Sequence, residues 1–149
     1  MKYTNDILTE IIVRDYHPDD YDAIMHLWEL TGLGGAKRGD DRAVVEKSIA
    51  MGGRLLVALH QDGLLMGTSW MTFDGRRIHL HHLGVHPEYR RKGIGRLLSI
   101  RSVDHAREKQ VQIKLEVHRD NQAAVALYKK LGFQYLGDYD VYIIRSFID

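Results

Sequence analysis

Residues 83–96, with the sequence LGVHPEYRRKGIGR, join the end of an apolar strand to a basic loop that opens a helix. Gly93 and Gly95 carry no Cβ, so the backbone there can adopt unusual angles and approach a ligand closely. The free N–H groups of the first helical turn point outward at such a ligand, and the helix dipole has the same positive sign. The segment therefore predicts a strand–loop–helix unit that binds a phosphate or pyrophosphate group.

Four cationic side chains add positive charge around these backbone donors: Arg90, Arg91, Lys92 and Arg96. The dinucleotide fingerprint G-x-G-x-x-G does not fit, because Leu98 occupies the position of its third glycine. The chain also lacks the P-loop pattern G-x-x-x-x-G-K-[ST]. A pyrophosphate loop of another kind remains, and the alternative is a loop of solvated arginines before an ordinary helix.

The composition favours a cofactor-binding protein over a polyanion-binding one. The length of 149 residues suits one domain, 1–149, with a single core. The net charge is +1, so global charge predicts neither nucleic acid nor a membrane surface as a partner. The chain has no cysteine, which excludes disulfides, thiolate zinc sites and a cysteine nucleophile. No apolar run approaches the ~20 residues that span a bilayer, and we expect a cytoplasmic protein.

Apolar spacing and turn residues predict alternating strands and helices without a linker or a repeat. The expected order is β-α-α-β-β-β-α-β-α-β-β: a strand at 10–16, helices at 18–31 and 40–51, strands at 54–61, 64–73 and up to 85, a helix to about 109, a strand at 111–117, a helix at 121–131, and a last pair of strands within 133–147. This order predicts an α/β (α+β) fold with a mixed, mostly antiparallel sheet of about six or seven strands and helices on both faces.

Two motifs, together with this order, resemble the GNAT acyltransferases over nearly the whole chain. Arg90-x-x-Gly93-x-Gly95 resembles the family signature [QR]-x-x-G-x-[GA], whose amides bind the pyrophosphate of coenzyme A. Residues 121–133 resemble N-x-x-A-x-x-L-Y-x-x-x-G-F, in which the asparagine approaches the pantetheine arm and the tyrosine lies beside the sulfur. The resemblance implies acetyl-CoA as cosubstrate, no metal, and coenzyme contacts at Leu83, Gly84, Val85, Arg90, Arg91, Lys92, Gly93, Ile94, Gly95, Arg96, Asn121 and Tyr128.

Direct attack of an amine on a thioester needs a neutral amine, a polarised carbonyl and a proton for the departing thiolate. The backbone of residues 83–85 is the candidate for the carbonyl, because in this family the strand splays from its neighbour there. Tyr128 is the candidate acid, since a phenol with an ordinary pKa near 10 stays protonated. The structural alternatives are that Asn121 is only a helix N-cap and Tyr128 only a core residue.

The general base has two candidates. Strand alternation predicts His79 and His81 on one face with Leu83 and Val85, where the coenzyme should lie. This pattern resembles the histidine pair of arylalkylamine N-acetyltransferases, and imidazole titrates close to neutrality. Glu116 is the other candidate, because it precedes the tyrosine by twelve positions, as a glutamate does in the acetyltransferases of ribosomal-protein N-termini. We favour the histidines; a zinc site on them would lack a third ligand.

We expect the acceptor to be a primary amine: a small amine, an amino-acid-like metabolite or a peptide N-terminus. In this fold the acceptor groove is formed by the first helices, their connecting loop and the last hairpin, which here contain Trp28, Leu33, Gly34, Gly35, Lys37, Arg38, Tyr139 and Tyr142. The alternative is a non-catalytic acetyl-CoA-binding or sensing module whose tail strands pair in a homodimer. The presence of the candidate acid and bases favours an enzyme.

Overall fold

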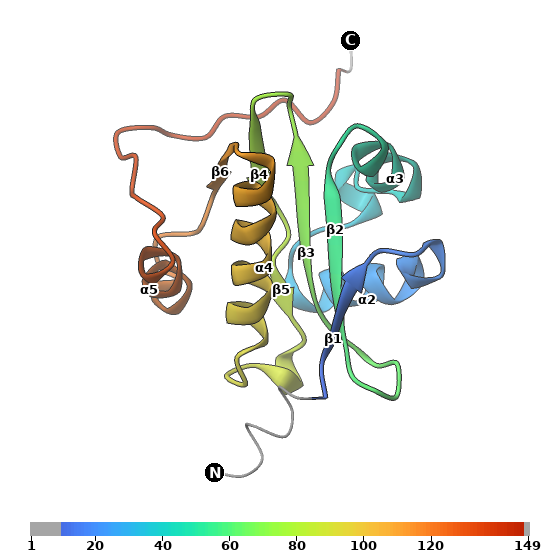
Figure 1. Ribbon diagram of the computed structural model, residues 1–149. Coiled ribbons are helices and arrows are strands. Elements are labelled where there is room, and N and C mark those ends of the chain that lie inside the picture. The colour runs from blue at the N-terminus through green and yellow to red at the C-terminus, as the bar shows by residue number, and fades with distance from the viewer. Residues whose placement is uncertain (1–9, 148–149) are drawn as a thin grey trace.

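The computed structural model describes residues 10–147, which form one sheet with helices on both faces (Figure 1). The sheet has six strands in the order β1-β2-β3-β4-β6, and β5 pairs with β3. The strands are β1 (Ile12–Asp15), β2 (Arg54–Leu59), β3 (Leu65–Phe73), β4 (Arg77–Leu80), β5 (Gly84–Val85) and β6 (Gln112–Leu115). All pairs are antiparallel except β4 with β6. The predicted fold class is confirmed.

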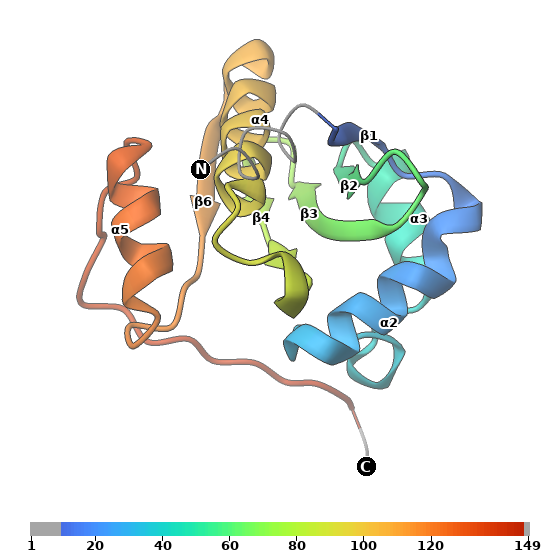
Figure 2. The ribbon, with the colours of Figure 1, turned by 90° about the horizontal axis from the view of Figure 1, so that it is seen from below.

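Helices cover the two faces of the sheet separately (Figure 2). The helices are α2 (Tyr21–Thr31), α3 (Arg42–Ala50), α4 (Ile94–Lys109) and α5 (Gln122–Lys130), with 3₁₀ turns η1 (Pro18–Asp20), η2 (Ala36–Arg38) and η3 (Pro87–Tyr89). Alternate side chains of β2 enter two different cores: Leu55 and Val57 pack with α2 and α3, whereas Leu56 and Ala58 pack with α4. We call the two sides of the sheet the α2/α3 face and the α4 face.

A β-bulge interrupts the strand that the sequence predicts up to residue 85. The backbone of Trp70 on β3 faces two residues: it accepts a hydrogen bond from His81 N (2.7 Å) and donates one to His82 O (3.3 Å). The register of β3 therefore changes by one residue between Met71↔Leu80 and Thr68↔Gly84. A bulge of this kind places two residues opposite one and bends the strand.

This bulge overturns the predicted facing of the strand. Leu80 lies in the α4-face core, and beyond the bulge Leu83 and Val85 pack against that same core. His81 and His82 contact Trp70 of the α2/α3 core instead. The histidines therefore do not share a face with Leu83 and Val85, because simple alternation ends where the extra residue is inserted.

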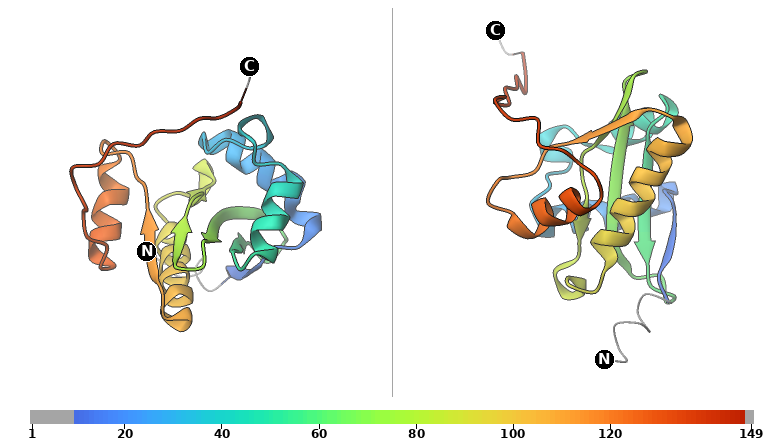
Figure 3. Two further views of the ribbon diagram at one scale, coloured as in Figure 1. Left: turned by 90° about the horizontal axis from the view of Figure 1, so that it is seen from above. Right: turned by 60° about the vertical axis from the view of Figure 1, so that its left-hand side comes forward.

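The last pair of strands, predicted within 133–147, is not formed in the structure. This tail leaves α5 and runs across the molecule toward the side of α2 and α3 (Figure 3). Its aromatic side chains are largely exposed, including Tyr142 (90%) and Phe147 (91%). β-Forming residues produce a strand only where they pair with a sheet edge, and the tail pairs with none of the described strands. Within residues 10–147, no helix is both long and apolar enough to cross a membrane.

Candidate active site

The predicted phosphate loop forms an open helix N-terminus. Helix α4 begins at Ile94 after Gly93, which adopts the left-handed conformation (φ +85°) and provides no side-chain cap. Arg91 is also left-handed (φ +64°), so two tight reversals bring the loop into the helix. The first amides of α4 thus remain available to an external acceptor. Ile94 is buried (1% exposed), so only its backbone can contact a ligand.

The loop is attached directly to the end of β5. Arg90 Nε donates a hydrogen bond to the carbonyl oxygen of Val85 (3.3 Å). A Cβ at Gly95 would lie 3.5 Å from Val85 Cγ2, so the first turn of α4 packs against the strand. The remaining cations of the loop, Arg91 and Arg96, are exposed, and Lys92 Nζ lies over the Tyr89 ring at 5.9 Å. The positive charge therefore surrounds the uncapped helix end.

The sheet opens beside this loop. Strands β4 and β6 pair in parallel as far as Leu80↔Leu115, whereas β5 pairs with β3 only. On its other side, the backbone of residues 83–85 thus has no partner strand within the described part of the chain. The splay that the family resemblance implied at these residues is present, and it leaves amide and carbonyl groups free for a ligand.

Three of the proposed catalytic side chains meet on the α2/α3 face. The rings of His79 and His81 are stacked, with centroids 4.2 Å apart and planes 10° apart. His79 Nε2 lies 3.8 Å from Glu116 Oε1, and His81 Nε2 shares a hydrogen bond with Thr72 Oγ1 (2.6 Å). The histidines and the glutamate, which the sequence presented as rivals, are neighbours in one cluster.

The protein surroundings hold both imidazoles in the neutral form. Burial, with repulsion from His79 and His82, lowers the pKa of His81 to about 4. Burial also lowers the pKa of His79, against a smaller upward effect of the Glu116 carboxylate. At neutral pH both histidines therefore favour the neutral form, which can accept a proton, and the pKa of each lies below the ordinary value that the sequence suggested. No group of three described His, Asp or Glu side chains is placed to hold a metal ion.

Residues of the second motif lie on α5, beyond β6 (Figures 1 and 2). Asn121 caps this helix, since its Oδ1 accepts a hydrogen bond from Ala124 N (3.3 Å). Tyr128 is half-buried, packs edge-on against Phe133 with ring centroids 5.5 Å apart, and has its pKa raised by burial. Among residues 10–147, its hydroxyl forms no hydrogen bond, and no hydrogen bond or ring pair joins it to His79 or Glu116. Tyr128 is thus not part of the histidine cluster.

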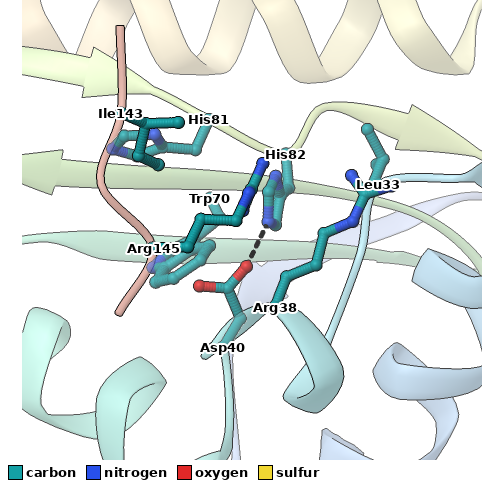
Figure 4. A pocket seen from close by; sticks show the side chains of 8 residues that line it. All are labelled: Leu33, Arg38, Asp40, Trp70, His81, His82, Ile143 and Arg145. Carbon is teal, nitrogen blue, oxygen red and sulfur yellow. Dashed lines mark hydrogen bonds and ion pairs between the residues drawn. The ribbon is translucent and has the colours of Figure 1, made fainter. Parts of the chain in front are cut away.

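Our sequence reasoning missed His82 and Arg145. A cavity of about 260 Å³ opens beside the bulge (Figure 4), lined by Leu33, Arg38, Asp40, Trp70, His81, His82, Ile143 and Arg145. His82 Nε2 bonds to Asp40 Oδ2 at 2.9 Å, and the ring lies edge-on to Trp28 with centroids 4.6 Å apart. The orientation of the His82 side chain depends on the bulge. The local sequence does not indicate a bulge, except through the adjacent Gly84. Leu33 and Arg38 were expected in an acceptor groove, and the structure places both at this cavity.

The structure and the sequence are similar to those of known acetyltransferases. An acetyltransferase of Pectobacterium atrosepticum is 28% identical over 127 residues, which are 82% of this chain and 86% of that protein. A putative acetyltransferase of Salmonella typhimurium, solved with its cofactor acetyl-CoA, is 25% identical, with a TM-score of 0.71 over 85% of this chain and 81% of that one. The ribosomal-protein-S18-alanine N-acetyltransferase of Escherichia coli shares the fold, at 23% identity and a TM-score of 0.67 over 83% and 77% of the two chains.

These likenesses agree with the open helix N-terminus, the splayed strand and the neighbouring proton acceptors. The model of the acetyltransferase (GNAT) family matches residues 10–133, which is most of the described chain, and the protein belongs to this family.

Proposed function

We propose that this protein is an acetyl-CoA-dependent N-acetyltransferase that acetylates a primary amine by direct attack of the amine on the thioester. The observation that carries the proposal is that a candidate base and an open strand edge lie next to each other in one stretch of the chain. His81 borders the cavity on the α2/α3 face, and residues 83–85, directly after the bulge, present the open strand edge. The acetyl-CoA bound to the Salmonella relative supports the same coenzyme here.

The residues present fit the coenzyme. Uncapped amides at the start of α4 suit a pyrophosphate, and exposed Arg91 and Arg96 add charge around it. The free edge of residues 83–85 suits the amide groups of the pantetheine arm, and its N–H groups can polarise a carbonyl. When bound, acetyl-CoA supplies the activated acetyl group.

The histidine cluster would remove the proton that the amine releases as the C–N bond forms. Neutral His81, which borders the cavity, accepts it. Because the His79 ring is stacked face to face on His81, the proton would reach His79 only through a bridging water. Glu116, 3.8 Å from His79, stabilises the imidazolium while the proton passes to water. We keep Tyr128 as the proposed proton donor to the departing sulfur, because its raised pKa keeps it protonated and because of its place in the family motif.

The proposal is tested by measuring thiol release from acetyl-CoA with a panel of primary amines, while mass spectrometry follows the addition of one acetyl group to the acceptor. We expect at least one amine class to be acetylated. The double variant His79→Gln/His81→Gln should retain coenzyme binding by calorimetry and lose most of its turnover, by ~10²-fold. Tyr128→Phe should behave in the same way. Tight acetyl-CoA binding without thiol release from any amine would replace the proposal with a sensing module.

The same assay separates the two bases. If the histidines accept the proton, Glu116→Gln weakens turnover only moderately, because it removes a stabilising charge and not the acceptor itself. If Glu116 is the base, the double histidine variant stays active and Glu116→Gln is the inactive one. Each comparison uses a single acceptor, since the ionisation of the amine itself depends on pH.

A further inference from the structure

We propose that the acceptor is a small amine that also carries a carboxylate, and that Arg38 and Arg145 bind this carboxylate in the cavity beside His81. The inference rests on the proposed function, since it assigns the substrate class of that same site. It follows from the charges, the shape and the position of the cavity.

The cavity has an excess of positive charge that the other described residues, 10–147, do not neutralise. Arg38 from η2 and Arg145 from the tail both line it (Figure 4). Neither guanidinium forms a hydrogen bond or an ion pair with another residue within 10–147. The acidic side chain in the lining is Asp40, whose Oδ2 is already bonded to His82 Nε2. Two forked cations therefore face one engaged carboxylate, which favours an anionic ligand.

The position of Arg38 is fixed by the surrounding loop. Gly35 and Gly39, which both have positive φ (+133° and +95°), flank η2. Gly35 O accepts hydrogen bonds from Arg38 N (2.9 Å) and from Asp40 N (3.1 Å), and the Asp40–His82 bond ties this turn to the bulge. A Cβ at Gly34 would lie 2.8 Å from Arg38 Cδ, so the absence of a side chain at Gly34 makes room for the arginine stem. The loop therefore fixes the backbone of Arg38 and leaves space for its stem, while the exposed guanidinium stays accessible to a ligand.

The cavity also has the right size and neighbours for a small amino acid. Its volume of about 260 Å³ lies just below the usual range for ligand pockets, which begins at ~300 Å³, so it suits a small ligand. Trp70 and Ile143 provide apolar walls, and His81 borders the same space. A molecule whose amine lies at His81 would therefore extend its other end toward the two arginines. We infer that free amino acids or ω-amino acids fit better than a peptide N-terminus, which would have to continue beyond the cavity.

The test compares each amino acid with its own amide as acceptor, across α-amino, β-amino and γ-amino acids. The wild-type protein should prefer the acid by at least tenfold in kcat/KM per unprotonated amine. Arg38→Gln and Arg145→Gln should each reduce this preference by about tenfold, mainly through KM, and should leave the amides unaffected. The acid-to-amide ratio of kcat/KM in the variant is divided by the same ratio in the wild type, which cancels differences in amine basicity. Arg76→Gln, an exposed arginine at the turn after β3, is the matched control and should keep the preference.

Binding provides a readout that does not need turnover. The same acids and amides are titrated by calorimetry into protein loaded with coenzyme A. Equal turnover and equal binding of acids and amides would overturn the inference, and acetylation of peptides alone would do the same. Either result would leave the acetyltransferase proposal intact. A different outcome is that acids bind more tightly than amides, that Arg38→Gln loses this preference, and that no thiol is released. That outcome would support the carboxylate site and reject the catalytic proposal.

Discussion

At the scale of single residues, the structure changes how His79, His81 and Glu116 are understood. The sequence predicts each as a possible base, because each has a suitable side chain at a family-like spacing. It does not predict that His79 Nε2 approaches Glu116 Oε1 to 3.8 Å, because that contact depends on the parallel pairing of β4 with β6. The three side chains form one cluster, in which His81 lines the cavity, and we propose that this cluster accepts the proton of the amine.

The lowered pKa of His81 has a consequence for stability. Its folded pKa, about 4, lies below the ordinary value of 6.5, so the unfolded chain binds the proton more tightly. This group's contribution is therefore constant above pH 6.5 and turns against the fold as pH falls from 6.5 toward 4. We expect the free energy of unfolding to fall between pH 7 and pH 5 less steeply in His81→Gln than in the wild type.

Urea denaturation at the two pH values measures this difference. His118→Gln, which removes an exposed histidine, is the control and should follow the wild type. An equal decline in His81→Gln and the wild type would show that His81 is not held in the neutral form.

At the scale of elements, the sequence correctly predicts the features that depend on local residue patterns. The glycine-opened helix and the antiparallel meander of β2, β3 and β4 follow from periodicity and turn residues. The bulge does not, since it arises where Trp70 pairs with both His81 and His82 across the sheet. For that reason the predicted facing of Leu83 and Val85 was wrong, whereas the predicted loop after them was right.

Gly84 shows how closely the bulged strand is packed. A Cβ there would lie 2.6 Å from Leu33 Cδ1 and 3.4 Å from Thr31 Oγ1, at the end of α2. Gly84→Ala should therefore push the Leu33 side chain aside and lower the free energy of unfolding by about 1 kcal/mol, the low end of the usual cost of overpacking. Gly95→Ala adds the same methyl group at an ordinary 3.5 Å from Val85 Cγ2 and should not destabilise the protein. Thermal unfolding of both variants provides the comparison, and equal melting temperatures would contradict this packing.

At the scale of the whole molecule, the tail connects α5 to the cavity on the α2/α3 face (Figure 3). Its alternating apolar residues predicted a strand pair, and a sequence cannot show whether a sheet edge is available to them. In the structure the tail supplies Ile143 and Arg145 to the cavity wall, while most of its large side chains stay exposed. The proposed acceptor site is therefore completed by residues that are distant in sequence from the proposed coenzyme loop.

Truncation after Gly137 isolates this contribution. Because the removed side chains are mostly exposed, we expect the melting temperature to change little. Acetyl-CoA affinity should be retained, since the coenzyme residues precede the cut, and KM for the acceptor should rise about tenfold or more. A large loss of coenzyme affinity, measured by calorimetry, would show instead that the tail supports the whole fold.

The most direct test of the account is calorimetric titration of acetyl-CoA into the wild type and Gly93→Val. Gly93 is left-handed at the start of α4, and a β-branched side chain there should block the close approach of the backbone. We expect wild-type binding and a loss of at least tenfold, about 1.4 kcal/mol, in Gly93→Val. Gly75→Val introduces similar strain (φ +89°) at the turn after β3 and should bind normally. Unchanged affinity in folded Gly93→Val would contradict the assignment of the coenzyme site to this loop.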